Sequence, residues 1–312
     1  METTKTNLII LGSGPAGCTA AIYAARSNIK PIMVNGTQPG GQLTITTDVE
    51  NYPGFRDPVL GPDLMDGMIN QAKNVGCEVL NEQITNINLD VYPYVLESGL
   101  SKSFITKSII IATGASAKWL GLENEEKYRG HGVSACATCD AFFFKGKKVA
   151  VVGGGNTAIE EALFLSKFAK EVIVIHRRNK LRAEKILQER AFSNNKISFI
   201  WDTTVVDING EDNPKILKNV TIKSLKNDST SSLELDGVFI AIGHEPNTLL
   251  FKNKLELDNQ GYLKVFNQVY TNKKGVFAAG DVHDKIFRQA VTAAGYGCMA
   301  ALEVEKFLES QE

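Results

Sequence analysis

The sequence predicts an α/β fold in which two similar units follow one another along the chain. Two glycine-rich turns support this, because each lies between a short apolar run and a segment compatible with a helix. The first turn begins at Gly12 and the second at Gly153, about one domain length apart. The length of 312 residues and the hydrophobic content of 43% suit two domains. We therefore expect two Rossmann-like dinucleotide-binding domains built on parallel sheets.

In the first unit, residues 8–11 form an apolar run typical of a buried parallel strand. The turn G-S-G-P-A-G follows it at residues 12–17. A helix is then expected over residues 18–27 and a second strand over residues 31–34. A G-x-G-x-x-G turn in this strand–helix–strand order indicates dinucleotide binding.

The second unit repeats this order. Residues 148–152 predict the strand, residues 153–158 form the turn G-G-G-N-T-A, residues 159–169 predict the helix and residues 171–175 the next strand. The repetition predicts two dinucleotides on one chain rather than one.

The remaining segments complete the sheets and helices. Between the turns, residues 61–75 have the apolar spacing of an amphipathic helix, and residues 78–111 predict a small run of strands. Further expectations are strands at 197–208, 220–225 and 233–242, polar turns at 209–214 and 226–232, and a last helix over about 288–309.

The composition argues against several classes of protein. The 34 basic and 35 acidic residues give a net charge of −1, so no basic excess exists to neutralise nucleic-acid phosphates. No apolar run approaches the roughly 18 residues of a membrane span. The first apolar run breaks at Gly12, Gly14 and Pro15, so a secretory signal is not predicted. We expect a cytoplasmic protein with neither nucleic-acid nor membrane partners.

Each position of the glycine turns has a physical purpose. A pyrophosphate binds at a helix N-terminus, where free backbone N–H groups and the helix dipole favour negative charge. The first glycine permits the tight turn, the second lets the phosphates approach the backbone, and the third position lets the helix pack closely on the strand. These positions are Gly12, Gly14 and Gly17 in the first turn and Gly153, Gly155 and Ala158 in the second. The alternative is that such turns only cap ordinary helices, which two copies make weaker.

The residues that end the second strand of each unit separate the two cofactors. An NAD site places an acidic residue there, on the ribose. The second unit has His176-Arg177-Arg178 instead, followed by Arg182, which favours the 2′-phosphate of NADPH over a merely solvated basic surface. The first unit ends in Asn35-Gly36, without an acid. This disfavours NAD there, whereas FAD sites vary more.

A second glycine loop, Gly40-Gly41-Gln42-Leu43, follows in the first unit. Its two glycines would let the backbone approach a flavin closely. The alternative is an ordinary hairpin turn.

Cys136 and Cys139 form a C-x-x-C pair, which suits either zinc or a redox dithiol. Structural zinc needs about four ligands, but the sequence has no second cysteine pair and no H-x₃₋₅-H spacing among its four His. We therefore expect no metal and favour a redox dithiol, served by a flavin that converts hydride into thiol chemistry. Cys18, Cys77 and Cys298 are expected to be small buried hydrophobes.

Asp140 directly follows this pair. It is placed to supply or take the proton of thiol–disulfide exchange if burial raises its pKa. The alternative role is the N-cap of a helical segment over residues 141–144, and both roles are compatible.

Taken together, the motifs resemble those of the low-molecular-weight thioredoxin reductases of bacteria and lower eukaryotes. The resemblance covers nearly the whole chain. Besides the turns, the basic cluster and the cysteine pair, it includes Glu50-Asn51-Tyr52-Pro53-Gly54, Ala112-Thr113-Gly114-Ala115, Arg182-Ala183-Glu184, Ile242-Gly243-His244, residues 275–281 and Arg288-Gln289-Ala290. Family members often have glycine where this chain has Ala141, and Pro39 is not family-wide.

The resemblance implies a homodimeric flavoenzyme in which NADPH reduces FAD, FAD reduces the Cys136–Cys139 disulfide, and the dithiol reduces thioredoxin. It implies an FAD domain split over residues 1–116 and 245–312, with an NADPH domain at 117–244 between the parts. The NADPH domain is expected to rotate between steps, about connections near residues 115–117 and 243–246.

The motifs and the resemblance together predict the site residues. The catalytic residues are Cys136, Cys139 and Asp140. The expected FAD-binding residues are Gly12, Ser13, Gly14, Pro15, Ala16, Gly17, Asn35, Gly36, Gly40, Gly41, Gln42, Leu43, Asn51, Ala112, Thr113, Gly114, Gly280, Asp281, Arg288, Gln289 and Ala290. The expected NADPH-binding residues are Gly153, Gly155, Asn156, Thr157, Ala158, His176, Arg177, Arg178, Arg182, Ile242 and Gly243.

Three alternatives are weaker. A flavin reductase that serves ferredoxin or flavodoxin would leave the cysteine pair idle. The flavoprotein component of a peroxide reductase carries additional N-terminal domains, for which the turn at Gly12 leaves no room. A non-catalytic NADPH-sensing or zinc-linked binding protein would be colourless when purified.

Overall fold

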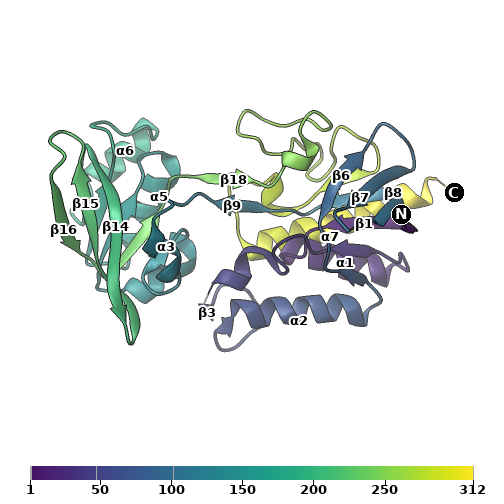
Figure 1. Cartoon of the computed structure of the whole chain (residues 1–312), viewed down its shortest axis with the longest axis horizontal. Helices are drawn as coiled ribbons and strands as arrows, with labels where there is room; N and C mark the ends of the chain where they lie inside the picture. Colours follow the sequence, from purple (N-terminus) through teal and green to yellow (C-terminus); the bar gives the residue numbers. More distant parts are fainter. Residues whose placement is uncertain (1, 47, 101, 312) are drawn as a thin grey trace. The chain divides into compact units, whose positions relative to one another are not determined.

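The computed structural model describes residues 2–46, 48–100 and 102–311, and the chain divides into two compact units (Figure 1). One unit comprises Met1–Ser116 and Glu245–Glu312, and the other comprises Ala117–His244. The outermost residues of the expected FAD domain, Met1 and Glu312, lie outside the described residues.

The first unit is built on a sheet with the strand order β5-β2-β1-β8-β7-β6, and β19 also pairs with β8. Strands β5, β2, β1, β8 and β19 are parallel, whereas β6 and β7 add antiparallel pairs. The strands are β1 (Glu2–Leu11), β2 (Ile32–Val34), β5 (Glu78–Leu80), β6 (Ile84–Asn88), β7 (Tyr94–Ser98), β8 (Lys102–Ile111) and β19 (Val276–Ala278).

Both faces of this sheet are buried. Leu8 and Ile10 on β1 pack with three helices, whereas the alternating Ile9 and Leu11 pack into a second cluster on the opposite face. The helices are α1 (Pro15–Arg26), α2 (Gly61–Asn74) and α7 (Ala290–Glu309). Burial on both faces explains why these strands have continuous rather than alternating apolar runs.

The second unit has a parallel sheet of order β10-β17-β11-β12-β13 and a separate antiparallel sheet of order β14-β15-β16. One face of the parallel sheet packs against its helices and the other against the antiparallel sheet. The elements are β10 (Val133–Ser134), β11 (Lys148–Val152), β12 (Glu171–Ile175), β13 (Ile197–Ile200), β14 (Thr203–Asp212), β15 (Lys215–Ser224), β16 (Thr230–Glu234), β17 (Gly237–Ile240), α3 (Glu123–Lys127), α4 (Ala137–Asp140), α5 (Asn156–Leu165) and α6 (Lys185–Phe192).

The chain crosses between the units twice, and the two crossing strands, β9 (Ala115–Ala117) and β18 (His244–Pro246), pair with each other. The other short elements are β3 (Asp48–Val49), β4 (Val59–Leu60) and the 3₁₀ helices η1 (Gly41–Ile45), η2 (Ala141–Phe144), η3 (Leu249–Phe251) and η4 (Gly280–Val282). None of the helices within the described ranges combines the length and the apolar character that crossing a bilayer requires.

Several expected boundaries were wrong. The polar turn at 209–214 is mostly strand, because β14 continues to Asp212 and β15 begins at Lys215. The turn at 226–232 is shorter than expected, since β16 begins at Thr230. The single strand at 197–208 is interrupted and forms β13 and β14. In the first two cases, pairing with a neighbouring strand overrides the polar composition of the segment. The third strand breaks beside Asp202, which has φ +49°.

Candidate active site

The first glycine turn follows β1, and its glycines are required for different reasons. Gly12 has φ +104°, and a Cβ there would lie 2.3 Å from Ala112 O. A Cβ on Gly17 would lie 1.9 Å from Gly12 O, so only glycine lets α1 pack this closely. Gly14, the N-cap of α1, is open, because the nearest atom to its Cβ position is Gly40 O at 4.0 Å. The turn therefore leaves backbone and a helix N-terminus accessible to an anion.

The second glycine loop of this unit packs against that turn. Gly40 N donates to the buried hydroxyl of Ser13 at 3.0 Å. Gly40 and Gly41 both have positive φ, and a Cβ on Gly41 would lie 3.4 Å from Gly14 Cα. The loop thus packs on the first glycine turn and is not an independent hairpin. Gln42 and Leu43 continue from it in η1.

Asn35 and Asp281 carry buried polar atoms that have no hydrogen-bond partner among the described residues. Asn35, after β2, donates through Nδ2 to Asn81 Oδ1 at 2.5 Å and leaves its own Oδ1 unpartnered. Asp281, in η4 after Gly280, leaves Oδ1 unpartnered. Burial and then the charge of Asp284 raise the pKa of Asp281 to about 7. Such atoms suit a ligand rich in hydroxyl groups.

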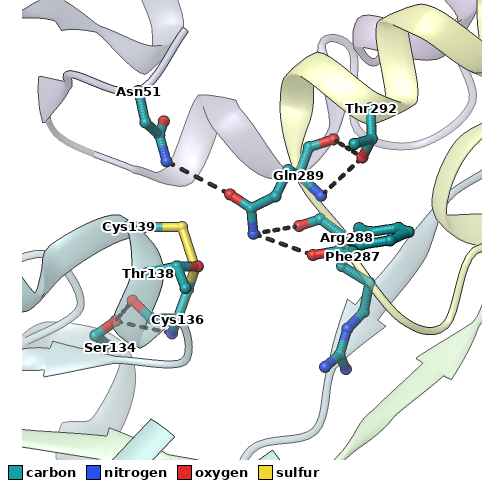
Figure 2. The surroundings of a disulfide bond; sticks show 9 residues. All are labelled: Asn51, Ser134, Cys136, Thr138, Cys139, Phe287, Arg288, Gln289 and Thr292. Atoms are coloured by element: carbon teal, nitrogen blue, oxygen red, sulfur yellow. Dashed lines mark hydrogen bonds between the residues drawn. A yellow bond between two sulfur atoms is a disulfide. The ribbon is translucent and has the colours of Figure 1, made fainter. Parts of the chain in front are cut away.

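The N-terminus of α7 brings together two residues that are 238 positions apart: Asn51 Nδ2 donates to Gln289 Oε1 at 3.5 Å (Figure 2). Gln289 also forms a capping box with Thr292, and its Nε2 donates to Phe287 O and Arg288 O at 3.1 Å. Ala290 is the first residue of the helix.

Thr113 and Gly114 hydrogen-bond to Asn247, beside the strands that cross between the units. Thr113 Oγ1 donates to Asn247 O at 2.8 Å, and Asn247 N donates to Gly114 O at 3.0 Å.

The second glycine turn repeats the steric logic of the first. Gly153 has φ +155°, and a Cβ there would lie 2.4 Å from Ala241 O and 2.7 Å from the Ala158 side chain. Gly155, the N-cap of α5, has open space around its Cβ position. Asn156 and Thr157 form the first turn of α5. The second turn also offers an open helix N-terminus to an anion.

The basic cluster after β12 divides into two kinds of side chain. Arg177, Arg178 and Arg182 are exposed, whereas His176 is buried. Burial is the main cause of a lowered pKa at His176, so its ring is uncharged near neutral pH. Ile242, which is exposed, and Gly243, with φ +108°, follow β17. The arginines are available to an anion, and the histidine faces inward.

Cys136 and Cys139 are joined by a disulfide at the start of α4 (Figure 2). Cys139 is exposed and Cys136 half-buried. The backbone N–H of Cys136 donates to Ser134 Oγ at 3.0 Å, which holds the start of the loop. No sequence motif marks Ser134, and its role was missed in the sequence. Because Cys139 is exposed, the disulfide is open to attack by a thiolate.

Asp140 lies one residue beyond the disulfide. Burial raises the pKa of its carboxyl group, and a hydrogen bond from Ser134 opposes that shift. Asp140 occupies the N-cap position of η2, as the capping alternative expected, but its side chain makes no capping bond there. The carboxyl group is thus placed to hold a proton to a higher pH than an ordinary aspartate.

The other cysteines follow the expectation in part. Cys18 and Cys77 are buried, and burial raises the pKa of each to about 12. Cys298 is only half-buried, on α7. Over residues 2–46, 48–100 and 102–311, no group of three or more His, Cys, Asp or Glu is arranged to hold a metal.

The similarity to known proteins extends over both units. The family model described as pyridine nucleotide-disulphide oxidoreductase matches residues 6–297. The thioredoxin reductase of Rickettsia conorii is 56% identical over 304 residues, which cover 97% of this chain and 98% of that protein. The thioredoxin reductase of Coxiella burnetii is 51% identical, with 97% of each chain covered. The crystal structure of thioredoxin reductase from Streptococcus pyogenes is 42% identical, with a TM-score of 0.92 over 98% of this chain and 99% of that one.

Proposed function

Because this chain belongs to the pyridine nucleotide-disulphide oxidoreductase family, and within it to the low-molecular-weight thioredoxin reductases, we propose that it reduces thioredoxin disulfide with electrons from NADPH. The observation that carries this proposal is the exposed disulfide between Cys136 and Cys139, in a chain with two dinucleotide-type glycine turns. A reductase that passes electrons to ferredoxin or flavodoxin has no use for such a pair.

FAD is proposed to bind the first unit. The open backbone at Gly14 and the N-terminus of α1 suit its pyrophosphate. The unpartnered oxygens of Asn35 and Asp281 suit its hydroxyl groups. The N-terminus of α7 at Gln289 would stabilise the negative charge of the reduced ring system. The other FAD residues expected from the sequence remain proposed ligands.

NADPH is proposed to bind the second unit. The open N-terminus of α5 at Gly155 suits the pyrophosphate. The exposed guanidinium groups of Arg177, Arg178 and Arg182 suit the 2′-phosphate, with which arginine forms bidentate, charge-assisted hydrogen bonds.

The chemistry of the cysteine pair balances as two electrons and two protons. FAD, when bound, supplies the conversion of hydride into thiol chemistry. Reduction of the Cys136–Cys139 bond gives two thiols. The thiolate of one cysteine attacks the thioredoxin disulfide to form a mixed disulfide, and the second cysteine then displaces reduced thioredoxin and restores the Cys136–Cys139 bond.

Asp140 is proposed to donate and accept the proton in this thiol–disulfide exchange. The departing sulfur needs a proton, and the attacking thiol must lose one. A carboxyl group with a raised pKa serves both needs better than an ordinary aspartate, which is almost fully ionised at neutral pH.

We further propose that the second unit rotates between steps. The disulfide and the proposed NADPH site both belong to residues 117–244, whereas the proposed FAD site belongs to the other unit. The chain passes between the units at β9 and β18, and Gly114 and Gly243 beside these strands have φ of +68° and +108°. Glycines at these positions can absorb torsion changes.

The assembly and location are proposed from the resemblance and the sequence. A homodimer should sediment at twice the chain mass of 34.0 kDa. A cytoplasmic location is where NADPH and a reduced thioredoxin pool are expected.

A purified sample tests the proposed function. The protein should be yellow, should bleach on addition of NADPH without oxygen, and should recover its colour with oxidised thioredoxin. Recovery with ferredoxin or flavodoxin but not with thioredoxin would overturn the proposal. A colourless protein that contains zinc would favour a binding protein instead.

A further inference from the structure

The arginine loop, defined here as residues 177–184, is hydrogen-bonded to the second glycine turn. The backbone N–H of Arg182 donates to Gly154 O at 2.7 Å. The backbone N–H of Glu184 donates to Asn156 Oδ1 at 2.8 Å, and Asn156 Nδ2 donates in return to Glu184 Oε1 at 3.2 Å. Asn156, the first residue of α5, is thus hydrogen-bonded to the end of the arginine loop.

His176 forms a further contact between the arginine loop and the turn. The residue is 4% exposed, and its ring Nε2 lies 3.1 Å from Lys180 O. Because a carbonyl only accepts, this nitrogen carries the ring proton and donates it. The ring also covers Gly154, where a Cβ would lie 2.3 Å from Cε1. A buried, uncharged ring that already donates to a carbonyl is poorly suited to bind phosphate.

Buried and exposed residues alternate along the end of the arginine loop. Leu181 and Ala183 are buried, and the alternate residues Arg182 and Glu184 are exposed. The bonds at Arg182 N and at Glu184 therefore fix the side of the loop from which the Arg182 guanidinium projects. Like charges repel, so the arginines need a support that holds them together in the absence of a phosphate.

We propose that His176 and Glu184 are positioning residues of the nucleotide site, which hold the arginine loop against the glycine turn so that its arginines converge on one phosphate. The proposal rests on the NADPH binding proposed above and deepens it. Neither His176 nor Glu184 touches the 2′-phosphate. The charge for that group comes from Arg177, Arg178 and Arg182.

Glu184 gives the sharper test, because simple electrostatics predicts the opposite result. The probe is adenosine 2′,5′-bisphosphate, titrated by calorimetry into the full-length, FAD-loaded protein. Glu184→Ala removes the acceptor of Asn156 Nδ2 and should weaken binding about fivefold. Glu184→Gln keeps an acceptor oxygen and should stay within about twofold of the wild type. The control Glu189→Ala removes the same charge from α6 and should change binding less than about twofold.

Other results would overturn the positioning role of Glu184. If Glu184 acted only as a negative charge near the phosphate, both of its variants would bind the probe more tightly. Unchanged binding of the probe by Glu184→Ala would mean that the hydrogen bond to Asn156 does not position the arginine loop. Equal weakening in both variants would mean that the charge, rather than the hydrogen bond, is needed.

A double-mutant cycle tests His176. The backbone of Gly154 does not have a positive φ, so alanine can adopt it, and the atoms nearest to its Cβ position all belong to the His176 ring, at 2.3–2.6 Å. Gly154→Ala should weaken probe binding at least about fivefold in the wild-type background. In the His176→Ala background the same change should cost less than about twofold, because the obstructing ring is gone. Equal losses in both backgrounds would contradict a role through this contact.

The two levels of the proposal fail differently. A wild-type protein that bound neither the probe nor NADPH would refute the proposed function itself. A wild-type protein that bound both, with Glu184→Ala binding equally well, would refute only the positioning role. Because Asn156 and Glu184 are exposed, the Glu184 variants are expected to fold, and thermal unfolding checks this.

Discussion

Ser134 Oγ accepts a hydrogen bond from the backbone N–H of Cys136 at 3.0 Å. The same side chain hydrogen-bonds to the carboxyl group of Asp140 and lowers its pKa, against the larger effect of burial. One serine therefore holds the disulfide loop and adjusts the proposed acid of the reaction. Ser134 and Asp140 can be tested as a pair.

Asp140→Asn should slow thioredoxin reduction by about 100-fold, because an amide cannot exchange the proton. In the wild type, a raised pKa means that the protonated form persists to higher pH than in an ordinary aspartate. The rate of a step that needs this proton should therefore fall as the pH rises through that pKa, and the variant should lose the inflection. Rapid-mixing rates from about pH 5 to about pH 9 measure this.

Ser134→Ala supplies the matched comparison. It removes the hydrogen bond that lowers the pKa of Asp140, so the inflection should move to higher pH. An inflection that stayed in place in Ser134→Ala, or that survived in Asp140→Asn, would assign the titration to another group.

The FAD-free protein should lose stability between about pH 4 and about pH 7 through Asp281. Its pKa is raised from 3.8 to about 7, so its contribution to folding is present below pH 3.8 and is lost as the pH rises through 7. The expected loss is about 2–4 kcal/mol. Urea unfolding of Asp281→Asn should lack this component, and the variant should exceed the wild type in stability at about pH 8. Parallel pH profiles for the two proteins would contradict the assignment.

Ser13→Ala should destabilise the FAD-free protein by about 1–3 kcal/mol. The substitution removes the acceptor of Gly40 N, which is buried, and an unsatisfied buried donor costs about this much. Ser27→Ala, at the other end of α1, should stay within about 0.5 kcal/mol of the wild type. Denaturant midpoints at constant m-value give the comparison, and equal effects would show that the contact between loop and turn is unimportant.

The double variant Arg177→Gln, Arg178→Gln should raise the KM for NADPH about 50-fold, since each arginine is expected to make a charged hydrogen bond to the 2′-phosphate. The KM for NADH should change less than about twofold, and kcat should be retained. Arg190→Gln on α6, which removes one positive charge outside residues 177–184, is the single-charge control. An unchanged preference for NADPH over NADH would mean that these arginines are solvated surface residues that do not bind the 2′-phosphate.

The parts of the fold with strong local signals were predictable. Strands β11 and β12 have the predicted bounds, because each is a buried apolar run that ends at a change of composition. The extension of β1 back to Glu2 was not predictable, since residues 2–7 are polar and become strand only through pairing with β8. The β14–β15 hairpin is similar, with two register shifts that no local pattern marks.

The candidate site shows the same division. The steric need for glycine at Gly12, Gly17 and Gly153 follows from the motif, and the structure supplies the obstructing atoms. The contacts that Ser134 and Glu184 make could not be predicted, because each depends on how a loop folds back on a neighbouring turn. The inward orientation of His176 was missed for the same reason: in the sequence it is one more basic residue beside Arg177.

The central claim is that the cysteine pair carries electrons from bound FAD to thioredoxin, and an anaerobic reductive titration with dithionite tests it most directly. The wild-type holoenzyme should take up about four electrons per chain, two for FAD and two for the Cys136–Cys139 disulfide. Cys136→Ser and Cys139→Ser should each take up about two, should still bleach with NADPH, and should fail to reduce thioredoxin. An uptake of about two electrons by the wild type, or full thioredoxin turnover by either variant, would contradict the claim.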